Sequence, residues 1–146
     1  MTAKEYLNQA YWLDKRINNK LNMVMSLREM TTRTTGIMSD DVVSHTRNVH
    51  SMQDAISKLV DLENDINADI DRLVDLKHEI IGIIEQVREP ACQIVLEYRY
   101  LCYNTWEEIA DKMQMHIRSV FRLHGRGMNA VEAILKKNPE FVSDCQ

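Results

Sequence analysis

The stretch that decides the fold is ISKLVDLENDINADIDRLVDLKHEIIGIIEQV, residues 56–87. Its apolar positions recur at alternating steps of three and four residues, which is the heptad pattern of a helix with one apolar face. These positions are Ile56, Leu59, Ile66, Ile70, Leu73, Ile80, Ile84 and Val87, and Glu63 and Lys77 fill the two remaining seam positions. The pattern predicts one long helix.

Further apolar residues lie beside this seam and widen the apolar face of the helix. They are Val60, Leu62, Val74, Leu76, Ile81 and Ile83. A two-stranded coiled coil needs only about two apolar positions in each heptad, so a broader face is typical of a helix with more than one neighbour. We therefore expect an earlier helix of the chain to fold back on it and a second copy of the chain to cover the rest.

The segment before this helix has a helical pattern of its own. Thr2 and Glu5 have the spacing of a capping box, in which two side chains satisfy free backbone N–H groups at a helix start. Apolar residues then follow at helical steps, namely Tyr6, Ala10, Leu13, Ile17, Leu21, Val24 and Leu27. The pattern predicts a helix from Thr2 to about Thr34, which Gly36 would end.

No apolar period is sustained over residues 36–50, which predicts a loop between the two helices. Residues 1–89 are therefore expected to form a long antiparallel helical hairpin that resembles a coiled coil. This hairpin would be the oligomerisation module, and the protein would be a homodimer.

Composition supports a helical chain and argues against several classes of protein. Of the 146 residues only 4 are Gly and 2 are Pro, so turns are few and the expected fold class is all-α. No apolar run approaches the roughly 18 residues that cross a bilayer, and the first residues lack the apolar centre of a secretion signal. The 3 cysteines form no CxxC pair, so we expect reduced thiols, a cytoplasmic location and no membrane partner.

Charge is distributed unevenly along the chain. The formal net charge is −4, yet residues 90–137 carry seven Lys or Arg against five Asp or Glu. Within residues 116–137 five basic side chains face a single acidic one, Glu132. A basic region on an acidic chain localises any interaction with a polyanion such as DNA.

A second module is expected to begin at Pro90. Proline is favoured at the first position of a helix and interrupts a helix that precedes it. After an apolar stretch, Thr105 and Glu108 again have capping-box spacing and predict a short helix. Residues 114–116 break that helix, and a further helix follows.

Two short helices joined by such a break form the helix-turn-helix arrangement. A small residue is needed where the helices cross, and apolar residues are needed around the turn and on the second helix. Ala110, Met113, Met115, Val120 and Leu123 stand at these positions. Residues 90–137 are therefore expected to form a DNA-binding domain, and residues 138–146 a tail.

The second helix of this arrangement would enter the major groove with its first turns. The candidate DNA-binding residues are His116, Ile117, Arg118, Ser119, Phe121, Arg122 and Arg126. Arginine is the side chain best matched to guanine edges and to phosphates. Two positions depart from the usual pattern. Gln114 stands where a glycine usually forms the turn, and His116 stands where serine or threonine usually caps the helix.

The stretch IVLEYRYLCYNTWEEIADKMQMHIRSVFRLHGRGM, residues 94–128, resembles region 4 of sigma-70-type factors, the module that recognises a promoter element. With TAKEYL, NQAYWLDKRIN and LVDLENDINADIDRLVDLKHEIIGII, nearly the whole chain resembles small phage and prophage proteins of the ArpU and RinA type. These are late-gene transcriptional regulators. The resemblance implies a sigma-like DNA-binding end on a helical stalk. It also implies a recognition helix over about His116–Met128 in a bacterial host cell, with Trp106 and Ile109 in the core.

No catalytic motif is found, so we do not expect an enzyme, and we expect neither a cofactor nor a metal. Duplex DNA is the expected partner, and host RNA polymerase a further one, because the chain lacks the other sigma regions. Two alternatives remain open. A small-terminase-like DNA-packaging adaptor would combine the same modules, and a helical interaction protein would use the C-terminal unit without binding DNA.

Overall fold

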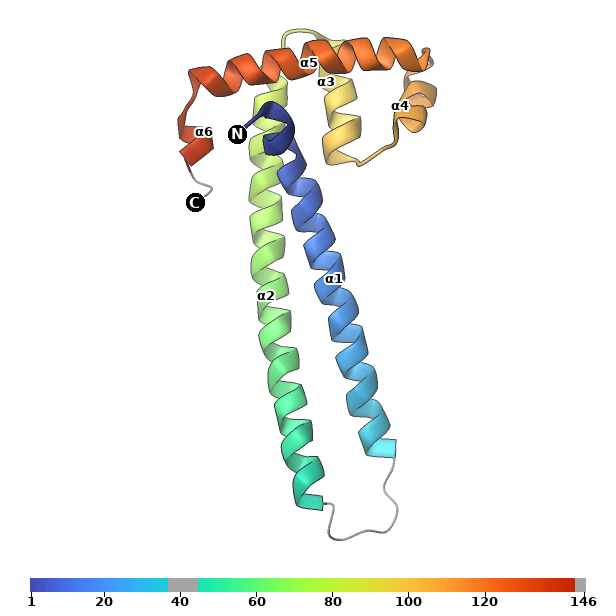
Figure 1. Ribbon diagram of the computed structural model, residues 1–146, viewed down its shortest axis with the longest axis vertical. Helices are drawn as coiled ribbons and strands as arrows, with labels where there is room; N and C mark the ends of the chain where they lie inside the picture. The colour runs from blue at the N-terminus through green and yellow to red at the C-terminus, as the bar shows by residue number, and fades with distance from the viewer. Residues whose placement is uncertain (37–44, 144–146) are drawn as a thin grey trace. The chain divides into compact units, whose positions relative to one another are not determined.

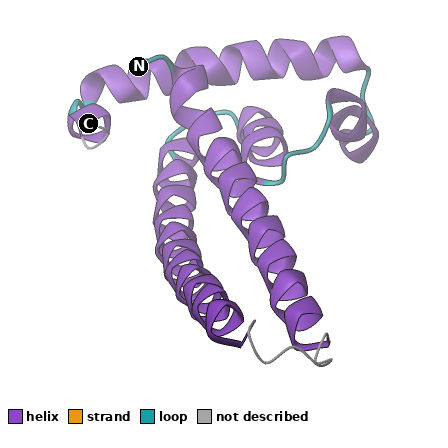
Figure 2. Ribbon diagram, turned by 60° about the horizontal axis from the view of Figure 1, so that its bottom comes forward, coloured by secondary structure: helices purple, strands orange, loops and turns teal. Residues whose placement is uncertain are grey.

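The computed structural model describes residues 1–36 and 45–143, and the side chains of residues 33–36, 45–50 and 142–143 are outside that description. Over this part of the chain every regular element is a helix, so the fold is all-helical (Figures 1 and 2). In these residues no helix is both long and apolar enough to span a membrane.

Seven helical elements follow one another in the described residues (Figure 1). The first two are long, α1 (Ala3–Gly36) and α2 (His45–Glu85). The others are short apart from α5, and they are α3 (Pro90–Leu96), the π-helix η1 (Glu97–Leu101), α4 (Trp106–Met113), α5 (Ile117–Lys137) and α6 (Glu140–Ser143).

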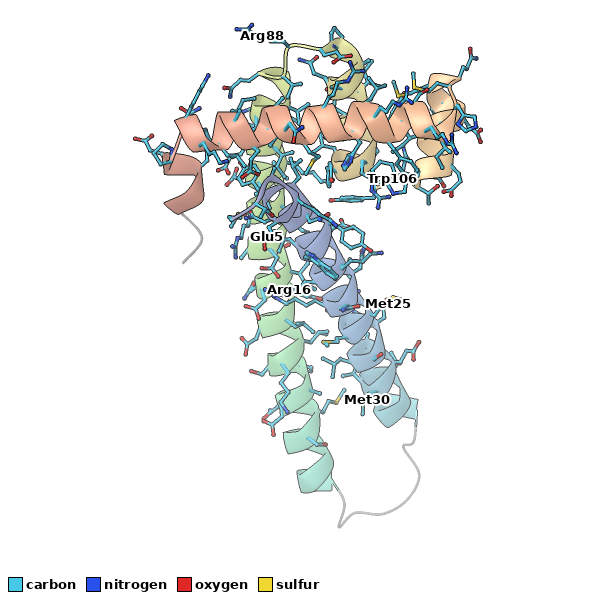
Figure 3. The ribbon with its side chains drawn as sticks, turned by 45° about the horizontal axis from the view of Figure 1, so that its top comes forward. Glu5, Arg16, Met25, Met30, Arg88 and Trp106 are labelled. Carbon is cyan, nitrogen blue, oxygen red and sulfur yellow. The ribbon has the colours of Figure 1, made fainter. Side chains whose placement is uncertain are left out.

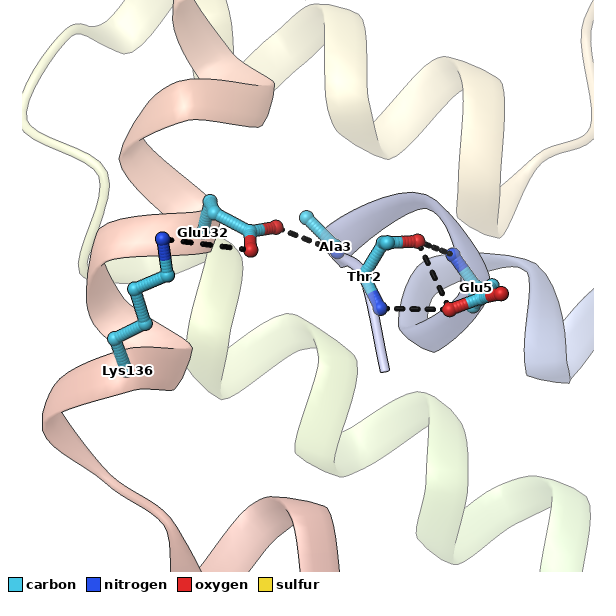
Figure 4. A network of polar contacts seen from close by, with 5 residues as sticks. All are labelled: Thr2, Ala3, Glu5, Glu132 and Lys136. Atoms are coloured by element: carbon cyan, nitrogen blue, oxygen red, sulfur yellow. Dashed lines mark hydrogen bonds and ion pairs between the residues drawn. The ribbon is translucent and has the colours of Figure 1, made fainter.

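The start of α1 follows from local hydrogen bonds, as the capping box predicts. The backbone N–H of Thr2 donates to Oε2 of Glu5 over 2.7 Å, and the N–H of Glu5 donates to Oγ1 of Thr2 over 3.3 Å (Figure 4). The Thr2 N–H, together with the Thr2 hydroxyl that donates to the same Oε2 over 3.0 Å, holds the pKa of Glu5 below its usual range. A third bond comes from α5, where Oε2 of Glu132 accepts from the N–H of Ala3 over 2.8 Å.

The prediction of a loop over residues 36–50 was wrong at the C-terminal end of that segment. Helix α2 begins at His45, whereas residues 37–44 lie outside the described part of the chain. Val49 and Met52 continue the three- and four-residue steps back from Ile56, so the heptad pattern starts earlier than the first strong apolar residues. Helix α2 ends at Glu85, and Val87 of the predicted seam lies beyond it but is still buried.

The described chain divides into two compact units, residues 1–13 with 73–146 and residues 14–72. This division does not coincide with the predicted segments 1–89, 90–137 and 138–146. In the first unit the start of α1 and the end of α2 share one apolar core with α3, α4 and α5. Its fully buried residues include Leu7, Ile80, Ile84, Leu96, Ile109, Val120 and Val131.

The second unit consists of the remaining parts of α1 and α2. Its buried apolar residues are Ile17, Val24 and Ile66. Two ion pairs link its helices, Lys20 with Asp69 at 2.6 Å and Arg28 with Glu63 at 2.5 Å. Many other large apolar side chains of this unit are exposed, among them Leu21, Met23, Met25, Met30, Ile56, Val60 and Ile70, and Figure 3 labels Met25 and Met30.

Candidate nucleic-acid interface

The helix α4 begins at the predicted capping box. The N–H of Glu108 donates to Oγ1 of Thr105 over 3.2 Å, and the N–H of Thr105 donates to Oε2 of Glu108 over 3.0 Å. Both bonds satisfy backbone donors that the first turn of a helix leaves free. Trp106 is therefore fixed as the first residue of α4, and Ile109 one turn later is fully buried.

A left-handed residue ends α4, although it is not glycine. Gln114 has φ 52° and ψ 45°, which lies in the left-handed region that costs a side-chain-bearing residue about 1 kcal/mol. The N–H of Met115 donates to the carbonyl of Ala110 over 3.1 Å, and the N–H of Gln114 donates to that of Asp111 over 3.2 Å. This pair of bonds is the Schellman motif. The turn thus has the backbone geometry that glycine usually provides.

The cap of α5 is His116. Its backbone is extended, with φ −66° and ψ 144°, and its Nδ1 accepts from the N–H of Arg118 over 3.2 Å. The bond requires an unprotonated Nδ1. The imidazole thus takes the place of the serine or threonine hydroxyl that usually caps this helix.

The first turns of α5 separate a buried side from an exposed side. Val120 and Leu123 are buried in the core of the first unit, together with the partly buried Met113 and Met115. Of the predicted contact residues, His116, Arg118, Phe121, Arg122 and Arg126 are exposed, whereas Ile117 and Ser119 are half-buried. Six of the seven predicted residues thus lie on α5 and His116 caps it; those on α5 range from exposed to half-buried.

The arginines of this surface differ in their partners. Arg126 lies 3.3 Å from the carboxylate of Glu89, so part of its charge is already balanced. Arg118 and Arg122 have no ion pair with any described residue. These two guanidinium groups are four residues apart, one turn of helix, and therefore point in similar directions. They are the arginines of the predicted set that are best placed to meet a polyanion.

An aromatic cluster that the sequence did not predict holds α5 against its neighbours. We name Tyr100, Trp106, Phe121 and His124 the aromatic bracket. The ring of Trp106, which Figure 3 labels, lies edge-on to Phe121 at 5.2 Å and to His124 at 4.7 Å between centroids. Nε2 of His124 and the hydroxyl of Tyr100 are 2.8 Å apart and share a hydrogen bond. Trp106, expected in the core, is instead half-buried at its edge.

Two cations shape the electrostatics of the aromatic bracket. The guanidinium of Arg99 lies over the ring of Trp106, 4.4 Å from its centroid. Burial lowers the pKa of His124, and the nearby positive charges of Arg99 and Lys4 lower it further. His124 is therefore held in its neutral form, which suits the hydrogen bond with Tyr100.

A pocket of about 460 Å³ lies elsewhere in the first unit. Its lining includes Arg88, Glu89, Cys92, Arg126 and Lys137. Burial raises the pKa of the Cys92 thiol to about 11, and the neighbouring Glu89 adds to the shift. The thiol therefore stays protonated near neutral pH and is a poor nucleophile.

Comparisons with protein-family models, with curated proteins and with solved structures gave no match to this chain.

Proposed function

We propose that this protein is a sequence-specific DNA-binding regulator of transcription, of the phage late-gene activator type. In this proposal α4 and α5 form a helix-turn-helix, and the first turns of α5 enter the major groove. Residues 1–89 form a helical hairpin that pairs two copies of the chain. The observation that carries the proposal is the left-handed turn at Gln114, which joins α4 to a helix with exposed arginines.

The local geometry supports a helix-turn-helix in three respects. Helix α4 is short, its end is set by a Schellman motif, and α5 starts after only three residues. Ala110, Met113 and Met115 pack against the same core as Val120 and Leu123. A helix-turn-helix needs these apolar contacts to hold its second helix at a fixed angle while the exposed side stays available to DNA.

The charges support a polyanionic partner. Arg118 and Arg122 are exposed and lack an ion pair with the described residues, so no internal carboxylate has to be displaced before they bind. Arginine donates two parallel hydrogen bonds to guanine O6 and N7 or to phosphate oxygens. The net charge of the whole chain is −4. Its acidic remainder therefore disfavours diffuse attraction to DNA and favours binding through this helix.

The contacts of the second unit support a hairpin that pairs with another copy. Its two ion pairs step forward along α1, from Lys20 to Arg28, while they step back along α2, from Asp69 to Glu63. Antiparallel helices produce this order. Exposed Leu21, Met25 and Val60 leave apolar area that a second copy would remove from water.

The test of DNA binding is the double variant Arg118→Ala and Arg122→Ala in the full chain. Duplex fragments selected from a random library by the unmodified protein serve as the ligand in a gel-shift or anisotropy titration. Each arginine–base pair contributes about 1–3 kcal/mol, so we expect affinity to fall by about tenfold or more. The slope of log affinity against log salt should also become shallower, by about one for each phosphate that the variant no longer neutralises.

The matched control removes two exposed arginines from outside α5, Arg72→Ala and Arg88→Ala, with the same change in net charge. This control should bind the selected duplex almost as well as the unmodified protein. Equal losses in both variants would indicate diffuse attraction only. Failure of the unmodified protein to select any duplex would favour the interaction protein without DNA binding.

A further inference from the structure

Phe121 is an anomaly on the proposed DNA-binding surface. Its side chain is 46% exposed, although it is large and apolar and lies between Arg118 and Arg122 in sequence. Neither of the two arginines has an ion pair with a described residue, and the buried side of α5 already contains Val120 and Leu123. Exposing an aromatic ring among cations needs a reason beyond core packing.

The position of the Phe121 ring is set by its neighbour on α4. Trp106 lies edge-on to it with 5.2 Å between centroids and an interplanar angle of 65°. Trp106 is itself fixed, because it follows the Thr105 cap, carries the Arg99 guanidinium over its face and meets His124. The exposed part of the Phe121 ring is thus held before a ligand arrives, which lowers the entropy lost on binding.

We infer that Phe121 selects thymine by packing the exposed part of its ring against the thymine 5-methyl group in the major groove. This inference rests on the proposed function. Among the base edges in that groove only thymine offers an apolar group, and a phenyl ring can neither donate nor accept a conventional hydrogen bond. Arg118 lies three residues before Phe121, and Arg122 lies one residue after it. In this arrangement the two guanidinium groups bind guanines or phosphates beside that thymine.

The structure also defines the competing explanation. Phe121 could serve only as packing for Trp106, in which case its ring would stabilise the fold and make no distinction between bases. The two explanations differ in one chemical group on the DNA. Deoxyuridine has the hydrogen-bonding edge of thymidine and lacks only the 5-methyl group, so the substitution leaves the protein fold and the phosphate contacts unchanged.

The experiment uses the full chain and the duplex it selects from a random library. Each thymine of the selected site is replaced singly by deoxyuridine, and the affinity is measured by anisotropy. Burying one methyl group contributes about fourfold in affinity, so we expect a loss of about that size at one thymine in each half-site. In Phe121→Ala the same replacement should have no effect, because the ring that contacts the methyl group is gone.

Phe141→Ala is the matched control, because Phe141 is the other exposed phenylalanine and lies on α6. That variant should keep the full response to deoxyuridine. If the protein selects a site but no thymine responds, or if Phe121→Ala keeps the response, the inference is overturned and DNA binding stands. If no duplex is bound at all, the proposed function and the inference are both overturned. Where Phe121→Ala does not fold, the unmodified protein still tests the inference, because a selected site without any responding thymine overturns it.

Discussion

At the scale of single residues, Gln114 shows how an unfavourable backbone angle can be retained. Its left-handed conformation lets the N–H groups of Gln114 and Met115 reach the last carbonyls of α4. Those two hydrogen bonds and the burial of apolar residues around the turn offset the cost of the angle. Glycine is the usual residue at this position of the turn. From the sequence alone we could not predict whether a turn with glutamine there would keep its usual backbone conformation.

We predict that Gln114→Gly stabilises the protein by about 0.5–1 kcal/mol, because glycine adopts left-handed angles without strain. Urea unfolding at fixed protein concentration measures the free energy of unfolding. Gln53→Gly is the opposite control, since Gln53 is exposed in the interior of α2 and glycine there should cost about 1 kcal/mol. A loss of stability in Gln114→Gly would mean that the glutamine side chain makes interactions that outweigh the strain.

At the scale of elements, His124 connects α5 to its neighbours. It meets Trp106 of α4 and shares a hydrogen bond with Tyr100 of η1, and the charges that face it are those of Arg99 and Lys4. Its pKa in the folded state is lowered from 6.5, chiefly by burial. The unfolded state therefore binds a proton more readily than the folded state.

The sign of the pH effect follows from this shift. Stability from neutral His124 is fully present above the unfolded pKa and is lost as pH falls from there towards the lower folded pKa. We predict that unfolding free energy falls as pH is lowered from about 8 to about 5, and that His124→Gln flattens this dependence. Chemical denaturation across that range checks both. Identical pH profiles for the two proteins would contradict a coupling between His124 and folding.

The elements also show which features of this fold are readable from sequence. The starts of α1 and α4 were predicted, because a capping box involves residues only three apart. The early start of α2 at His45 was missed, because its first residues are mostly polar and only Val49 and Met52 continue the apolar steps before Ile56. The aromatic bracket was missed because its contacts join residues far apart in sequence, such as Tyr100 and His124. The π-helix η1 was missed although its hydrogen bond from Cys102 to Glu97 is local, because no apolar period of the sequence marks it. Arg118 and Arg122, which the sequence analysis names as candidate DNA contacts, are both exposed.

At the scale of the whole molecule, the exposed apolar residues of the second unit lead to a prediction about assembly. Met25 and Val60 are 62% and 49% exposed, on α1 and α2 respectively. A second copy that buries them would gain roughly 1.5–3 kcal/mol for each side chain. We predict that the protein is a dimer, and that Met25→Glu with Val60→Glu raises its dissociation constant by at least about tenfold.

Sedimentation equilibrium measures the dissociation constant directly. Asn22→Glu with Asn64→Glu is the matched control, because both asparagines are exposed on the same two helices and the added charge is the same. A dimer that resists both pairs of substitutions would place the interface elsewhere. A ring of many copies would instead favour the packaging adaptor, and bound genomic sites at packaging signals would favour it further.

The bond between Glu132 and the N–H of Ala3 has a practical consequence. Glu132 is also within 3.8 Å of Lys136, so the opening residues of the chain are tied to the helix that is proposed to touch DNA. Tyr6, Leu7 and Ala10 belong to the interior that α5 closes. A fragment cut at Pro90, the obvious place for dissection, would be missing part of its own hydrophobic interior. A fragment made to study the proposed DNA-binding helix should therefore retain the first residues of α1, without a bulky fusion beside them.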